Sequence, residues 1–199
     1  GARDSGADGT LPFLLGGEHL VTLPAFRAVH EKYPDVAVIH FDAHTDLREE
    51  YLGNRLSHAT VIRRIWEIIG DGRIFQFGIR SGERAEWYWS AEGHTKIQKF
   101  SFTGLDETIA ALKGRPIYLT IDLDVLDPSC FPGTGTPEAG GVRFTDLLSA
   151  ALRTIRGCQI VGCDMVELSP PLDPSGTSTA TALKLLREML LALEKPYLK

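Results

Sequence analysis

The chain has 199 residues, a length that suits one domain with one sizeable hydrophobic core. Its formal net charge is −5 at pH 7, and 43% of its residues are hydrophobic, with no run of lysine or arginine. This balance argues against a nucleic-acid-binding protein, and no apolar run is long enough to cross a bilayer. We therefore expect a globular protein without nucleic-acid or membrane partners and without a signal peptide.

The three cysteines, Cys130, Cys158 and Cys163, do not have zinc-finger spacing. Cys158 and Cys163 lie in an apolar run, so we expect core thiols in a reducing compartment and hence a cytoplasmic location. Residues 1–10 are rich in small and polar residues and show no periodic pattern. We expect them to be a disordered or truncated edge that lacks an N-terminal part, and residues 11–199 to form a single domain.

Short apolar runs alternate with stretches of helical periodicity along the chain. The predicted strands occupy residues 11–15, 36–41, 73–79, 96–100, 116–123 and part of 158–168. The predicted helices occupy residues 22–33, 58–69, 82–90, 105–113, 145–155 with Thr145 as its N-cap, and 179–193. This alternation, with short connections, predicts an α/β fold of three layers, α-β-α, around a mostly parallel central sheet.

Polar side chains follow three of the predicted strands, where sites form in parallel sheets. Asp42, His44 and Asp46 occupy alternate positions after one strand, and alternate residues of an extended segment point the same way. Asp122 and Asp124 repeat this spacing after another strand. A single Asp at a strand end could be a loop residue or a helix cap, but such a set at several strand ends predicts a shared site.

A metal centre explains why so many acidic residues would meet, because buried carboxylates repel one another without a counter-ion. The predicted ligands are His19, Asp42, His44, Asp46, Asp122 and Asp124. Four carboxylates and two imidazoles without a thiolate suit manganese, with zinc, cobalt or iron as alternatives. Six protein ligands are too many for one catalytic ion with an open position, so we expect two ions that share bridging carboxylates.

Two further residues are candidates for catalysis. His58 begins a predicted helix and is either a structural histidine or a proton shuttle beside the metals. Glu167 follows a strand and is either a surface residue or a carboxylate that holds a cation. His30, His40 and His94 are expected to be structural or exposed, with His40 on the second face of its strand.

The glycine-rich segment 133–141 could suggest a phosphate loop, but it lacks the lysine and the spacing of a P-loop. Glycine allows a close approach of the backbone, so a wall of the active site is the better interpretation.

Three segments resemble the signature blocks of the arginase–agmatinase, or ureohydrolase, family. They are residues 16–19 (Gly-Gly-Glu-His), 42–46 (Asp-Ala-His-Thr-Asp) and 122–128 (Asp-Leu-Asp-Val-Leu-Asp-Pro). The resemblance runs from about residue 11 to the C-terminus. Leu20 and Ala59 depart from it, where the family usually has serine and glycine. Both changes flank the functional side chains and do not remove them.

The resemblance implies an arginase/deacetylase-like fold with two Mn²⁺ ions on the six predicted ligands. Asp42, Asp46 and Asp122 would bridge the ions, and water activated by the ions would attack a guanidinium carbon. Asp46 would pass a proton to the leaving amine, His58 would match the shuttle histidine, and Glu167 would grip the guanidinium. The resemblance also implies a homo-oligomer, either a trimer or a hexamer.

The substrate is suggested by the loop at residues 47–57, which does not resemble the Asn- and Ser/Thr-rich loop of arginases. Glu49 and Glu50 would oppose a carboxylate tail and tolerate an amine if they face the pocket; otherwise they are solvated. We expect agmatine to be hydrolysed to putrescine and urea. The alternatives are arginine, guanidinobutyrate, formiminoglutamate, or a non-catalytic metal-binding relative.

Overall fold

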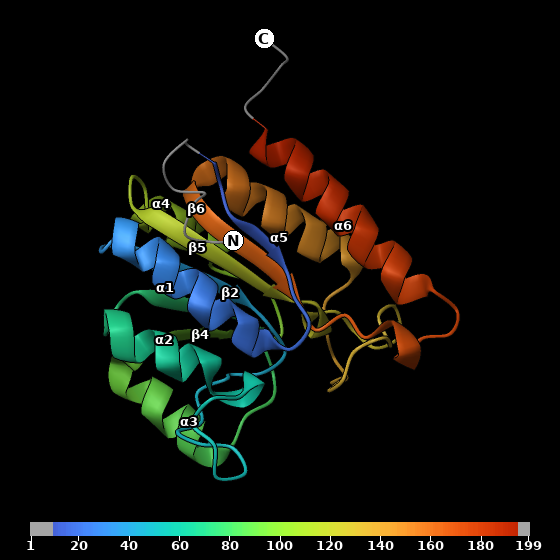
Figure 1. Cartoon of the computed structure of the whole chain (residues 1–199), viewed down its shortest axis with the longest axis horizontal. Coiled ribbons are helices and arrows are strands. Elements are labelled where there is room, and N and C mark those ends of the chain that lie inside the picture. Colours follow the sequence, from blue (N-terminus) through green and yellow to red (C-terminus); the bar gives the residue numbers. More distant parts are fainter. Residues whose placement is uncertain (1–9, 195–199) are drawn as a thin grey trace.

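The computed structural model describes residues 10–194, whose centre is a six-stranded sheet in the order β1-β6-β5-β2-β3-β4 (Figure 1). All strand pairs are parallel. The strands are β1 (Phe13–Leu15), β2 (Ala37–Phe41), β3 (Ile74–Ile79), β4 (Lys96–Lys99), β5 (Pro116–Asp122) and β6 (Gln159–Val166). Parallel strands present their carboxyl ends at one edge, so the loops after β2 and β5 meet there.

Helices cover both faces of the sheet, which confirms the predicted three-layer fold (Figure 1). The helices are α1 (Thr22–Lys32), α2 (Val61–Ile69), α3 (Arg84–Trp89), α4 (Leu105–Ala111), α5 (Phe144–Gly157) and α6 (Thr177–Leu193). One hydrophobic cluster joins the sheet to α1 and α2, and the other joins it to α4, α5 and α6. None of the helices within residues 10–194 is long and apolar enough to span a membrane.

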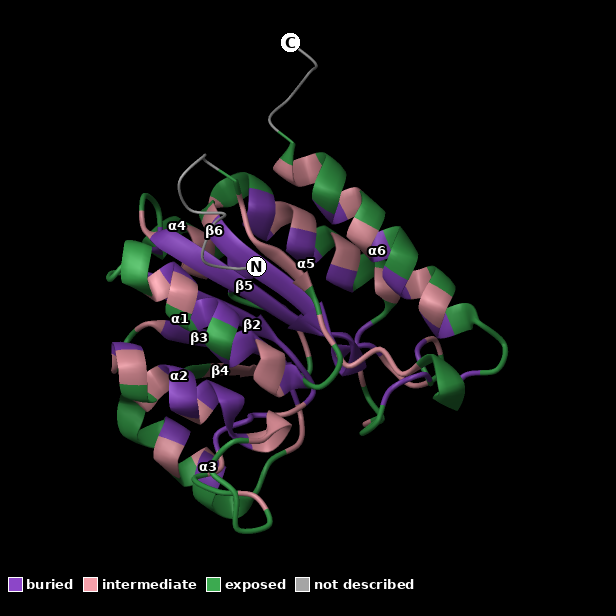
Figure 2. Cartoon of the chain, in the orientation of Figure 1, coloured by how far each residue is buried: buried purple, intermediate pink, exposed green. Residues whose placement is uncertain are grey.

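The continuous apolar runs of β2 and β5 follow from this double cover. Val38 and Tyr118 pack toward α1 and α2, while Ile39 and Leu119 pack toward α4 and α5. Every residue of both strands is buried, and the strands lie between helices on either side (Figure 2). Strands covered on both faces lack the polar alternation of a half-exposed sheet.

Most predicted boundaries agree with the structure to within a few residues, but two helix starts were wrong. Residues 58–60 form a 3₁₀ turn, because the Thr60 N–H donates to the Ser57 carbonyl at 3.0 Å, and α2 begins only at Val61. Helix α5 begins at Phe144, so Thr145 is not its N-cap; instead the Asp146 carboxylate accepts a bond from the Arg143 N–H at 3.3 Å.

Candidate metal centre

The register of the sheet brings the two acidic segments to the same level. Phe41 of β2 lies opposite Ile121 of β5, so Asp42 and Asp122 follow side by side at the edge of the sheet. Both share a strand face with Val38 and Tyr118, which pack toward α1. The turn between β1 and α1 carries His19 onto the same place, where the side chain is fully buried.

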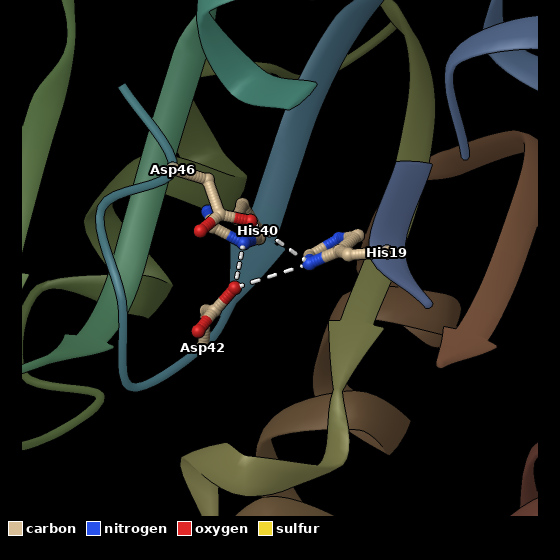
Figure 3. Close-up of side chains that lie close together, drawn as sticks. All are labelled: His19, His40, Asp42 and Asp46. Carbon is tan, nitrogen blue, oxygen red and sulfur yellow. Dashed lines mark hydrogen bonds and ion pairs between the residues drawn. The ribbon is translucent and has the colours of Figure 1, made fainter. Parts of the chain in front are cut away.

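A first cluster of ligand atoms surrounds the imidazole of His19. Its Nδ1 lies 3.2 Å from Asp42 Oδ2, 3.1 Å from Asp46 Oδ2 and 3.1 Å from Asp122 Oδ2. Figure 3 shows Asp42 and Asp46, from the segment after β2, pointing toward His19, which comes from the turn before α1. Within the described part of the chain, this buried Nδ1 makes no hydrogen bond of normal geometry. One ring nitrogen among three carboxylate oxygens is a donor set for a divalent cation.

A second cluster adjoins the first and shares Asp42 with it. His44 Nδ1 lies 3.0 Å from Asp124 Oδ2 and 3.4 Å from Asp42 Oδ1, and the His44 side chain is 22% exposed. The three residues offer ligand atoms close enough together to hold one ion. Asp42 turns one oxygen to each cluster, so it could bridge two ions. The structure therefore brings together all six residues that the sequence nominated as metal ligands.

His40 belongs to this region, contrary to the prediction that it faces the other side of its strand. It is fully buried, and its Nε2 lies 2.7 Å from Asp42 Oδ2 (Figure 3). The Gln76 amide donates to His40 Nδ1 at 3.0 Å and to the Thr45 carbonyl at 2.7 Å, so the His40 proton must be on Nε2. His40 therefore donates to Asp42 and orients this carboxylate, although its position would also allow it to ligate a metal.

Backbone and hydroxyl groups fix the other ligands. The Asp124 N–H donates to Asp122 Oδ1 at 2.9 Å, and the Ala43 N–H donates to Asp124 Oδ1 at 3.1 Å. His19 Nε2 lies 2.9 Å from the Thr120 hydroxyl, which leaves Nδ1 free to bind a cation. Ligands held in this way need little reorganisation when an ion binds.

The electrostatics of the cluster show that it requires bound cations or protons. Burial and the charge of Asp42 raise the pKa of Asp46 to about 7, and burial with the charges of Asp124 and Asp42 raises the pKa of Asp122. Burial opposes the charging of His44, but its hydrogen bonds to Asp124 and Asp42 raise its pKa to about 12. These carboxylates cannot all be ionised at neutral pH without positive charge between them, and divalent ions meet this requirement.

Asp46 and Glu167 share an uncommon backbone conformation. Their φ angles are 54° and 64°, in the left-handed region that non-glycine residues rarely occupy. The Asp46 carbonyl accepts a bond from the Arg63 N–H at 3.1 Å, and Glu167 Oε1 accepts one from the His19 N–H at 2.7 Å. Such strained backbone conformations persist where tertiary contacts fix them, and they are common at functional sites.

A cavity of about 400 Å³ opens beside the second cluster. His44, Asp46 and His58 line it, together with Thr136 and Pro137 of the glycine-rich segment. The His58 ring packs edge-on against Tyr51, with the ring centroids 5.3 Å apart. The site therefore has room for a small molecule next to the metal residues, and His58 is within its wall.

Comparison with known proteins now identifies the family, since a model of the arginase family matches residues 1–192. The chain belongs to the arginase family. It is 48% identical to the agmatinase of Bacillus subtilis over 94% of its own length and 65% of that protein. It is 38% identical to a guanidinobutyrase of Pseudomonas aeruginosa, covering 93% of this chain and 61% of that protein.

Solved structures agree with this family assignment. A candidate agmatinase from Clostridium difficile superposes with a TM-score of 0.90 at 56% identity, covering 94% of this chain and 68% of that one. The chain thus spans about two thirds of the length of the relatives that it matches. The arginase/deacetylase-like fold expected from the sequence motifs is therefore confirmed.

The carboxylates that line the cavity are not Glu49 and Glu50, which the sequence offered as either pocket or solvated residues. Glu49 and Glu50 are exposed, and neither is among the described residues that line the cavity. Glu83, Glu86 and Glu138 line it instead. They come from the start of α3 and from the glycine-rich segment, so only the folded chain brings them together.

Proposed function

We propose that this chain forms the active site of a binuclear metal hydrolase that converts agmatine and water into putrescine and urea. The observation that carries the proposal is the pair of ligand clusters around His19 and His44, joined through Asp42. The agmatinase relatives at 48% identity support the choice of substrate. Putrescine production would place the enzyme in polyamine biosynthesis.

The six ligands would divide between two ions. His19, Asp46 and Asp122 surround one position, His44 and Asp124 surround the other, and Asp42 contacts both groups. We propose manganese, since oxygen and imidazole donors without thiolate suit it. When bound, the two ions would supply a nucleophile from water at neutral pH and a Lewis acid.

Three side chains would handle the substrate and its protons. Glu167 would hold the guanidinium: Oε1 is engaged by the His19 N–H, while Oε2 faces the side of Gly135, where a Cβ would lie 4.0 Å away. Asp46, which lies beside His19 at the first cluster, would accept a proton from the attacking water and pass it to the leaving amine. His58 would exchange protons between the cavity and solvent.

The overall reaction balances with these roles. A C–O bond forms between the water oxygen and the guanidinium carbon, and the C–N bond to the aminobutyl chain breaks. Both protons of the water reach the departing nitrogen, which leaves as an ammonium group of putrescine, while the remaining carbon unit leaves as neutral urea.

We also propose a cytoplasmic homo-oligomer, either a trimer or a hexamer. The cysteines are free thiols, which fits a reducing compartment. Helix α6 exposes Leu183 (60%), Leu190 (45%) and Leu191 (58%), apolar side chains that a neighbouring subunit could cover.

Urea release from agmatine and from arginine tests the activity on the purified protein, loaded with manganese or treated with a chelator. We expect manganese-dependent urea from agmatine alone. Urea from arginine but not agmatine would contradict the substrate, and would favour an arginase. Stoichiometric metal with no urea from agmatine, arginine or 4-guanidinobutyrate would favour a non-catalytic relative.

A further inference from the structure

The cavity beside the metal residues contains one fixed positive charge that the proposed chemistry does not use. Among the described residues that line the cavity, Arg48 is the only arginine or lysine. It follows Asp46 by two residues, and its backbone N–H donates to the Ala59 carbonyl at 3.1 Å, next to His58. Arg48 is therefore well placed to meet the far end of a substrate whose guanidinium lies at the metal centre.

Carboxylates already occupy the Arg48 guanidinium. Its Nη1 lies 3.0 Å from Glu83 Oε1, and its Nε lies 3.8 Å from Glu86 Oε2. The guanidinium also lies over the Tyr51 ring, 5.0 Å from the centroid. Tyr51 in turn contacts His58, so a continuous wall connects Arg48 with the candidate proton shuttle.

Glu86 makes this arrangement rigid. Its side chain is 5% exposed, and it accepts bonds from the Leu47 N–H at 2.9 Å, from the Thr45 hydroxyl, and from the Glu83 N–H at 2.6 Å. Glu86 thus ties the loop after Asp46 to the start of α3. Because Glu86 is saturated with such bonds, Glu83 is the partner of Arg48 that a substrate could replace.

The sign of the charge around the cavity favours a cationic tail. Glu83, Glu86 and Glu138 oppose one guanidinium, and Glu138 Oε1 lies 3.9 Å from His44 Nε2, close to the metal residues. A substrate ammonium would meet surplus negative charge here. A substrate carboxylate would meet repulsion, and would find Arg48 already paired.

We propose that the Arg48–Glu83 ion pair selects the charge of the substrate tail. Glu83 keeps Arg48 occupied, so guanidino compounds that end in an amine are accepted and those that end in a carboxylate are rejected. This inference rests on the proposed function and assigns its tail specificity to two residues. The side chains of Arg48 and Glu83 are 29% and 58% exposed, and such partly exposed pairs are weak, so loss of Glu83 alone would release Arg48.

The test compares kcat/KM for agmatine and 4-guanidinobutyrate, which carries a carboxylate where agmatine has an aminomethyl group. Glu83→Gln keeps the shape of the side chain and removes its charge. We expect the ratio of agmatine to 4-guanidinobutyrate to fall about tenfold, chiefly through a rise for the acid substrate. The double variant R48Q/E83Q should lose that rise, because the released cation is gone.

Glu50→Gln is the matched control, because it removes the same charge from an exposed residue that lies in the loop of Arg48 but does not line the cavity. Its substrate ratio should equal that of the wild type. Metal content and Tm are measured for every variant, and both should be unchanged in Glu83→Gln if the residue acts only on the tail.

The outcomes separate this inference from the proposed function. A wild type that cleaves agmatine but whose ratio is unaltered by Glu83→Gln overturns the inference and leaves the function intact. A rise for the acid substrate that persists in R48Q/E83Q also overturns it, because Arg48 would not be the receiving group. A wild type that holds metal but releases urea from neither substrate overturns both.

Discussion

The two halves of the candidate site are built in different ways. The candidate metal ligands lie at or near strand ends, are largely buried, and are oriented by neighbouring N–H groups, as Asp122 and Asp124 show. The outer wall of the cavity is formed by side chains such as Arg48 and Glu83, which are partly exposed and meet through one ion pair. Changes in the first region should therefore abolish the chemistry, whereas changes in the second should alter which substrate is used.

The strongest expected loss is in Asp124→Ala. It removes a carboxylate that lies 3.0 Å from His44 Nδ1, so the second proposed ion should lose one of its ligands. Urea release should fall by more than the roughly 10- to 100-fold that removal of a supporting hydrogen bond costs. Metal analysis should find less than the wild-type content. Asp127→Asn is the control, because Asp127 caps the Gly140 and Gly141 N–H groups instead of joining the cluster.

His58→Ala tests whether a residue of the cavity wall takes part in the reaction without binding metal. The ring lines the cavity and contacts Tyr51, but lies outside both ligand clusters. If it exchanges protons, turnover should fall about a hundredfold while metal content stays at the wild-type level. Partial rescue by added imidazole would support proton transfer. Loss of metal along with activity would instead place His58 among the ligands.

His40→Ala tests whether a hydrogen bond that orients a metal ligand contributes to metal affinity. It removes the hydrogen bond at 2.7 Å that orients Asp42, so metal affinity should fall by about 10- to 100-fold. Titration of the metal-free protein with Mn²⁺ measures this directly. His94→Ala is a suitable control, since His94 bonds to Asp71, away from the site. Equal affinities for both variants would contradict the supporting role of His40.

The difference between the regions also decides what the sequence could predict. Alternating Asp42, His44 and Asp46 reveal a ligand set because an extended segment has a period of two, and the parallel sheet then places Asp122 beside them. The same period places His40 on the strand face of Asp42. The correct side of His40 could therefore have been predicted from the sequence, although our prediction placed it on the opposite face.

The outer wall could not be predicted in this way. Arg48 and Glu83 are 35 positions apart, and they meet because Glu86 ties their two loops together. No local pattern encodes that contact; the sequence left Glu49 and Glu50 as either pocket or solvated residues, and both are exposed. The left-handed backbone at Asp46 and Glu167 was also beyond prediction, since it is imposed by tertiary contacts and not by residue type.

The smallest predicted effect concerns the stability of the metal-free protein. Burial raises the pKa of Asp46 to about 7, above its usual value of about 3.9, and the pKa values of Asp122 and Asp124 are also raised by burial and by neighbouring charge. At pH values between the unfolded and the folded pKa of Asp46, the folded state binds more protons than the unfolded state. The free energy of unfolding therefore falls as the pH rises through 7.

Chelated protein should accordingly melt about 5 °C lower at pH 8 than at pH 5.5, a shift that corresponds to one or two protonation steps in a chain of this size. The low pKa of Asp127, about 2, does not interfere, because that carboxylate is ionised in both states across this range. Manganese should reverse the trend, since bound cations replace the protons and bind more tightly as the pH rises. Asp46→Asn should weaken the dependence in the chelated protein without abolishing it, because His44, whose pKa is raised to about 12, also keeps its proton in the folded state over this range. A Tm that rises from pH 5.5 to pH 8 without metal would mean that the buried carboxylates are ionised, and that another positive charge balances them.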